Sequence, residues 1–145
     1  MLRYAFTTRI PLAVLITLGV KRWENRACLP TPQVGKCLMT CSKNSSPQEY
    51  KVFQQWGQRV LPKEISLLIP TWEMVENWRG KGVAVCDYTA TTNSGPMIWN
   101  EGYPYWWELS NVHLLQCPIP CKGNVGMWVM SPELSSEVEV QLAKL

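Results

Sequence analysis

The sequence has few of the side chains on which most catalytic sites depend. Among its 145 residues it contains one histidine, His113, and one aspartate, Asp87. It has no glycine-rich phosphate loop and no C-x-x-C redox motif. Charged residues make up only 17% of the chain, and the net charge of +3 is spread without a basic stripe. These absences argue against an enzyme, against nucleic-acid binding, and against a bound cofactor or metal.

Cysteine, by contrast, is abundant for a chain of this length. The six are Cys28, Cys37, Cys41, Cys86, Cys117 and Cys121, with the same C-x3-C spacing at 37/41 and at 117/121. Cytosolic thiols stay reduced, so this even number indicates an oxidising compartment and a set of structural disulfides. Zinc ligation is the alternative, but zinc sites usually combine C-x2-C or C-x4-C pairs with further cysteines or histidines. The pairing of the cysteines stays open.

The twin C-x3-C pairs resemble those of the small chaperones of the mitochondrial intermembrane space. The two pairs lie far apart in this chain, and Pro118 and Pro120 exclude a regular helix at the second pair. The resemblance implies a disulfide-bearing domain in the intermembrane space. The secretory route is the other compartment that fits.

Residues 1–26 form a hydrophobic N-terminal segment. Its first nine residues carry basic but no acidic side chains, and an apolar run follows over residues 10–20. A helix over that run would span about 16 Å against a hydrocarbon core of about 30 Å, which is the length of a signal-peptide core. Positive charge on both flanks, at Arg9 and Lys21, favours a retained anchor in which residues 4–23 contact membrane lipid. A signal cleaved near residue 19 is the alternative.

Local signals predict several elements in residues 27–145, which we expect to form a single domain. Ser46, Pro47 and Glu49 are the residues of a capped helix start, and this helix should end before Pro62. A helical turn from residue 33 would place the first cysteine pair on one face. A second helix is predicted over residues 71–79.

The second half of the chain has the pattern of strands. Residues 83–89 and 97–99 predict a hairpin, with a turn over residues 93–96 between them. Residues 125–130 predict a further strand. The tail after residue 131 fits either a helix that begins with a capping serine or an alternating strand.

An aromatic cluster surrounds Pro104. Its members are Tyr103, Tyr105, Trp106 and Trp107. Four aromatic side chains in five positions around a proline cannot all face one core, so some should be exposed. Exposed aromatic clusters are typical of interfaces, and we expect these four residues to bind a partner.

Together these features predict an α+β fold: a small disulfide-stapled domain with much irregular structure, preceded by a short N-terminal hydrophobic helix. The expected function is that of a non-catalytic accessory subunit of a membrane-embedded organellar complex, in particular of the mitochondrial respiratory chain. Its domain would face the intermembrane space from the inner membrane and bind other protein subunits. The alternative is a small secreted disulfide-rich binding protein with a cleaved signal peptide and a glycan on Asn44.

Overall fold

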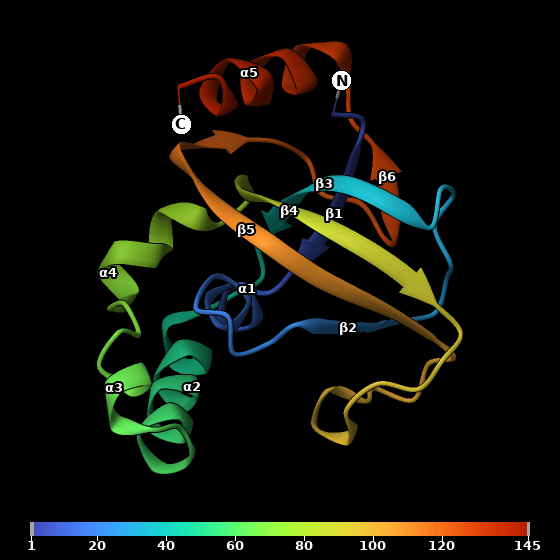
Figure 1. The fold of residues 1–145 in the computed structure, drawn as a ribbon. Helices are drawn as coiled ribbons and strands as arrows, with labels where there is room; N and C mark the ends of the chain where they lie inside the picture. The colour runs from blue at the N-terminus through green and yellow to red at the C-terminus, as the bar shows by residue number, and fades with distance from the viewer. Residues whose placement is uncertain (1, 145) are drawn as a thin grey trace.

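The computed structural model describes residues 2–144, which form an α+β fold built on one curled sheet (Figure 1). The six strands are β1 (Tyr4–Thr8), β2 (Trp23–Arg26), β3 (Val34–Cys41), β4 (Lys81–Thr91), β5 (Tyr105–Pro120) and β6 (Met127–Val129). The five α-helices are α1 (Ile10–Thr17), α2 (Pro47–Val60), α3 (Lys63–Ser66), α4 (Trp72–Val75) and α5 (Pro132–Leu142). Short 3-10 turns form at Glu76–Trp78 and Met97–Trp99.

The strands lie in the order β2-β5-β4-β3-β1-β6. β1 runs parallel to β3, and the other neighbouring pairs are antiparallel. The long β4–β5 pair shifts register twice, between Gly82 and Ala84 and between Val85 and Asp87. Bulges of this kind bend a strand and increase its twist, which accounts for the curl of the sheet.

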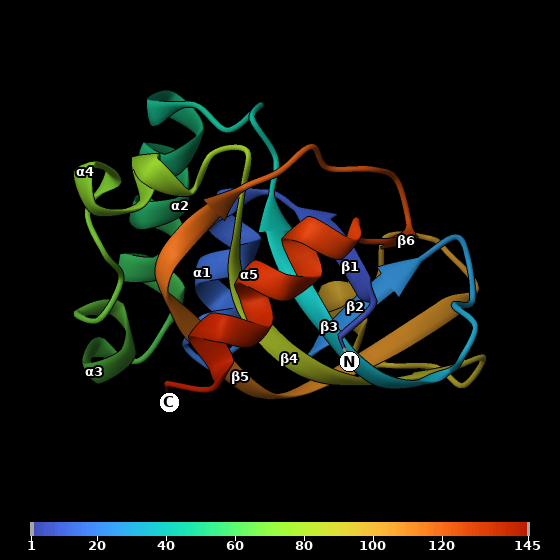
Figure 2. The same cartoon turned by 90° about the horizontal axis from the view of Figure 1, so that it is seen from above.

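Helices cover both faces of the sheet. Figure 2 shows α5 crossing one face while α1 lies behind the other. The larger core, on the α1 and α2 side, includes Phe6, Val14, Tyr50, Tyr88 and Trp107. The smaller core, under α5, includes Leu38, Val85, Leu115, Leu134 and Val138. Because both faces are packed, the strands carry apolar side chains on each side.

The N-terminal segment belongs to this sheet and its core. β1 lies between β3 and β6, with Tyr4 opposite Cys37 on one side and Val129 on the other. Six of the eight residues of α1 are buried, which is why this helix is apolar all round. The prediction of a hydrophobic helix that precedes the domain is therefore wrong, since the helix is enclosed by the domain. The predicted boundary at residue 26 falls at the end of a strand of the same sheet. No helix formed by residues 2–144 is long and apolar enough to cross a membrane.

The Ser46 cap and the proline predicted for the start of α2 are confirmed. The Ser46 hydroxyl accepts a hydrogen bond from the N–H of Glu49 at 3.2 Å, and Pro47 occupies the first turn. The Glu49 carboxylate does not complete the capping box, because it forms an ion pair with Arg9 instead. That pair and the backbone N–H of Ile10, which donates to the Ser45 hydroxyl at 3.0 Å, tie the start of α2 to the start of α1.

Replacing Ser46 with alanine is expected to lower the free energy of unfolding by about 1 kcal/mol, because one N–H group in the first turn of α2 loses its acceptor. Urea denaturation measures the change. Ser94→Ala, at an exposed position in the loop after β4, is the control and should change stability by less than about 0.5 kcal/mol. Equal effects of the two substitutions would contradict the capping role.

Other elements differ from their predictions where long-range pairing outweighs local pattern. The predicted second helix divides into α4 and the 3-10 turn that follows it, and Thr71 makes no side-chain cap. Met97–Trp99 is a 3-10 turn, so the hairpin partner of β4 is β5. The first C-x3-C pair lies on strand β3, not on a helix. The tail is helical, with the Ser131 hydroxyl accepting from the N–H of Leu134 at 3.2 Å.

Candidate functional site

The two tryptophans of the predicted partner-binding cluster are core residues. Trp106 and Trp107 lie in β5 and are 5% and 0% exposed. Adjacent strand residues point to opposite faces of a sheet, and each indole meets another ring. The centroid of Trp106 lies 6.3 Å from that of Trp23, and the centroid of Trp107 lies 6.1 Å from that of Phe6, both edge-on. The sequence predicted that some of the four side chains are exposed, which holds for Tyr103 and not for these two, and partner binding by the cluster stays a prediction.

The six cysteines are free thiols in the structure, so the predicted disulfide staples are absent from it. Cys37 on β3 and Cys86 on β4 are direct partners across the strand pair, and their Sγ atoms lie 3.7 Å apart. The hydrogen bond with Cys86 and burial raise the pKa of Cys37, and burial raises the pKa of Cys41 to about 12. Cys28 and Cys117 are exposed. Two packed apolar cores hold the domain together, as expected for a chain of this length.

Alkylation distinguishes these thiols. In the native protein, iodoacetamide at neutral pH is expected to modify Cys28 and Cys117 readily, because they are exposed. Cys37, Cys41 and Cys86 should react only when the sheet opens, since they are buried and two of them have raised pKa values. Peptide mass spectrometry measures the labelling, and labelling in denaturant is the control. Cysteines that resist iodoacetamide in denaturant until a reductant is added would contradict the free thiols.

A network of three charged side chains lies where the chain passes from α1 into β2. Glu24 accepts from Lys21 Nζ through Oε1 at 2.7 Å and from Arg26 Nε through Oε2 at 2.8 Å. The Lys21 and Glu24 side chains are each 4% exposed. Lys21 Nζ also donates to the carbonyl of Trp23 and lies 5.1 Å from the ring centroid of Trp99. Burial of these charges is possible because they are paired and hydrogen-bonded.

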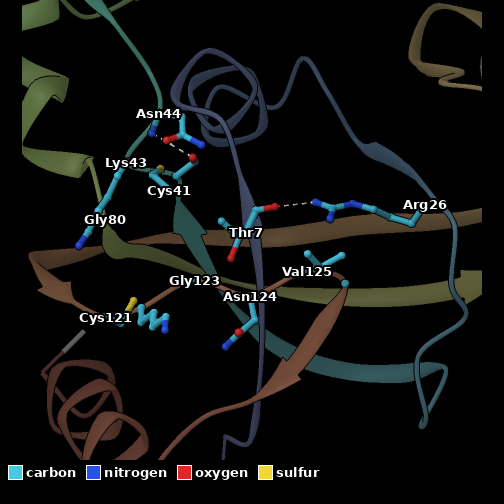
Figure 3. A pocket seen from close by; sticks show the side chains of 13 residues that line it. Thr7, Arg26, Cys41, Lys43, Asn44, Gly80, Cys121, Gly123, Asn124 and Val125 are labelled. Carbon is cyan, nitrogen blue, oxygen red and sulfur yellow. Dashed lines mark hydrogen bonds between the residues drawn. The ribbon is translucent and has the colours of Figure 1, made fainter.

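The guanidinium of Arg26 is held from several directions. Its carbon Cζ lies 5.5 Å from the ring centroid of Phe6 and 5.2 Å from that of Trp107. Nη2 donates to the carbonyl of Thr7 at 2.9 Å (Figure 3), and Glu24 fixes the other edge. The Arg26 side chain is 18% exposed, so part of this fixed cation faces solvent.

Two neighbouring cavities lie beside Arg26, with volumes of about 560 and 340 Å³. They adjoin, since both are lined by Thr7, Arg26, Ser42, Val125 and Gly126, and we call the two together the Arg26 groove. The parallel strands β1 and β3 end at the same edge of the sheet, which brings Thr7 and Ser42 together. The larger cavity, which we call the wide end of the groove, is drawn in Figure 3. It is also lined by Cys41, Lys43, Asn44, Gly80 and residues 121–124. The smaller cavity, which we call the narrow end, is lined by residues that include Arg9, Glu24, Glu101 and Tyr103.

Asn25 positions the loop that carries two of the narrow-end residues. It is 1% exposed, and its Nδ2 donates to the carbonyls of Tyr103 and Tyr105 at 2.8 and 2.9 Å. Its Oδ1 accepts from the N–H groups of Glu101 and Tyr103 at 2.8 and 2.9 Å. These four bonds satisfy the amide and hold the loop against β2. Tyr103 is 47% exposed and lines the groove, while Tyr105 is half-buried.

The sequence contains one signal for this site that charge counting overlooks. In the sequence, Lys21 and Arg26 look like cations flanking an apolar run. Glu24 changes that interpretation, because residues two apart on a strand share a face and Glu24 and Arg26 carry opposite charges. A buried ion pair was therefore predictable in kind, although its contact with β1 was not.

No family model matches this chain, and comparison with curated proteins finds no match. The functional argument therefore depends on the geometry of the groove.

Proposed function

We propose that this protein is a ligand-binding domain whose Arg26 groove holds a small molecule with a negatively charged group. The observation that carries the proposal is the Arg26 guanidinium, which is fixed by Glu24, the Thr7 carbonyl and two aromatic rings while lining both ends of the groove. A cation that is already ordered loses little conformational entropy when it binds an anion, so more of the interaction energy appears as affinity.

The hydrogen-bond pattern leaves Arg26 with a donor for such a ligand. Nε and Nη2 are occupied by Glu24 and Thr7, whereas Nη1 makes no hydrogen bond to any residue within 2–144. The two oxygens of Glu24 are occupied by Lys21 and Arg26. Glu24, the carboxylate that neutralises Arg26, therefore lies on the Nε side of the guanidinium, away from Nη1. Guanidinium groups bind carboxylate and phosphate oxygens well because their donors are planar and permanently charged.

Backbone amide NMR of ¹⁵N-labelled protein tests this proposal. Titration with citrate and, separately, with inorganic phosphate is expected to shift the amides of Arg26, Ser42, Val125 and Gly126, which line both ends of the groove. Low ionic strength is required, since salt screens exposed charges. If neither anion shifts these amides at concentrations up to about 10 mM, or shifts appear only elsewhere, the proposal is wrong.

Arg26→Lys provides a matched variant, because it keeps the charge and removes the planar fork. The variant is expected to weaken binding of whichever anion shifts the groove amides. Arg26 also packs in the core, so the amide spectrum without ligand must first show that the variant is folded. If Arg26→Lys is folded and binds as well as the wild type, Arg26 is not the anchor.

The accessory-subunit function expected from the sequence remains a prediction. Three features suggested it: the apolar N-terminal run, the six cysteines and the Tyr/Trp cluster. The structure buries α1, Trp106 and Trp107 within the domain and holds the cysteines as free thiols. Exposed apolar side chains occur instead on the helical side of the molecule, among them Val60, Leu67, Leu68 and Met74. The mitochondrial and secreted locations likewise remain predictions.

A further inference from the structure

The loop after β5 lines the wide end of the groove, and its backbone N–H groups have no partner within residues 2–144. It consists of residues 122–126, whose sequence is Lys-Gly-Asn-Val-Gly. None of its five N–H groups donates a hydrogen bond to another residue within 2–144. Consecutive free backbone amides in an irregular loop can form a concave site for an anion. Glycine suits this loop because Gly126 has a φ of +70° and a Cβ on Gly123 would lie 2.8 Å from Thr7 Oγ1.

The same end of the groove is positively charged. Arg26, Lys43 and Lys122 line it, and no Asp or Glu is among its lining residues. Neither lysine forms an ion pair with a residue of the described chain. Arg26 is paired with Glu24, which lines the narrow end. The wide end therefore has two unpaired lysines, Lys43 and Lys122, in addition to Arg26, which is paired with Glu24.

We propose that the wide end of the Arg26 groove is a subsite for a phosphate group, carried by a small phosphate monoester. The turn after β3 supplies Lys43 and the loop after β5 supplies Lys122 and the free amides, while Arg26 of β2 lies across the cavity from Lys43 (Figure 3). Donors on several sides suit a tetrahedral group with oxygens in several directions better than a planar carboxylate, which is bound along one edge. Two unpaired lysine ammonium groups also suit a group that carries up to two negative charges.

The inference deepens the proposed function, since it assigns a chemical class to the anion and a place within the groove. The narrow end, with Tyr103, Glu24 and Glu101, would then face the remainder of the monoester. A carboxylate there repels phosphate, which fixes the orientation of the ligand. The aromatic ring and carboxylate acceptors at that end favour a ligand whose other part has hydrogen-bond donors.

Inorganic phosphate and acetate are the probes that test the subsite. In an amide NMR titration at low ionic strength and pH 8, phosphate is expected to shift the amides of residues 122–126, and acetate to bind at least about ten-fold more weakly. The double variant Lys43→Gln/Lys122→Gln should weaken phosphate binding by about ten-fold or more, because two of the three cations are gone. Lys51→Gln removes one exposed lysine on α2, outside the groove lining, and should leave the phosphate affinity within about two-fold.

The outcomes separate the subsite from the proposed function. Phosphate shifts that include residues 122–126 and are lost in the lysine double variant support the subsite. The phosphate subsite is overturned if acetate binds as tightly as phosphate at the same amides, or if the lysine double variant binds phosphate as tightly as Lys51→Gln does. Either result leaves the ligand-binding function standing. If phosphate, acetate and citrate all leave the groove amides unshifted, both proposals are wrong. The lysines are exposed, so their substitution should not prevent folding.

Discussion

Glu24→Gln is expected to lower the free energy of unfolding by about 3 kcal/mol or more. The carboxylate is the counterion of Lys21 and of Arg26, and the Lys21 side chain is only 4% exposed. The glutamine side chain keeps the size and one acceptor oxygen, but it leaves the Lys21 ammonium buried without an opposite charge. Removing one member of a buried ion pair is far more destabilising than removing both, because the remaining charge still has to be desolvated.

Urea denaturation of two further variants checks the cause of that loss. Glu49→Gln removes a glutamate whose ion pair with Arg9 is half-exposed, so it should lower stability by no more than about 1 kcal/mol. Lys21→Met/Glu24→Gln removes the buried ammonium together with its counterion and should be more stable than Glu24→Gln alone. If Glu24→Gln is as mild as Glu49→Gln, or if adding Lys21→Met destabilises further, burial of the charge is not the cause.

Trp107→Ala is expected to lower the free energy of unfolding by about 3–5 kcal/mol. The indole is fully buried, meets Phe6 edge-on, lies against the Arg26 guanidinium, and donates from Nε1 to the carbonyl of Cys28 at 3.1 Å. Alanine leaves a cavity in the core and frees one side of Arg26. Trp107→Phe keeps a ring beside the guanidinium and should recover part of the lost stability.

Tyr103→Ala is the matched comparison, since both residues belong to the same aromatic cluster. Tyr103 is 47% exposed, so its truncation should change stability by about 0.5 kcal/mol or less. Urea denaturation of the two variants, monitored by far-UV circular dichroism, measures the difference. If the two changes are equally harmful, or if Trp107→Ala is tolerated, the cluster is not divided between core and surface as the structure shows.

Local signals were sufficient for the elements whose ends they mark. Ser46 marks the start of α2 because its hydroxyl acts within three residues, and Ser131 marks the start of α5 in the same way. Residues 83–89 predicted the middle of β4, because a composition rich in strand-forming residues is visible within a single strand. The general α+β class followed from these pieces.

Features that depend on topology were not predictable. An apolar run of the length of α1 fits a membrane segment or a buried helix equally well, and only the strands around it decide between them. The site required the same information, since Arg26 meets Thr7 and Phe6 on β1 and Trp107 on β5. Contacts between residues this far apart in the chain produce no periodic pattern in the sequence. The cysteine spacing could not show which cysteines lie close together, for a related reason. Cys37 and Cys86 are neighbours because of the register between β3 and β4, which the spacing alone does not reveal.

The position of β1 has a consequence for how the chain folds. Tyr4 pairs with Cys37 on one side and with Val129 on the other, so β1 is hydrogen-bonded to β6, the last of the six strands in chain order. During synthesis, one side of β1 stays without its partner until residues 127–129 are made. Pairing between such distant residues requires closing a long loop. The entropy lost in closing it is offset only after the strand contacts have formed, which slows folding. We therefore expect the β1–β6 pairing to form late, and a nascent chain that lacks β6 to expose the edge of β1 to other strands.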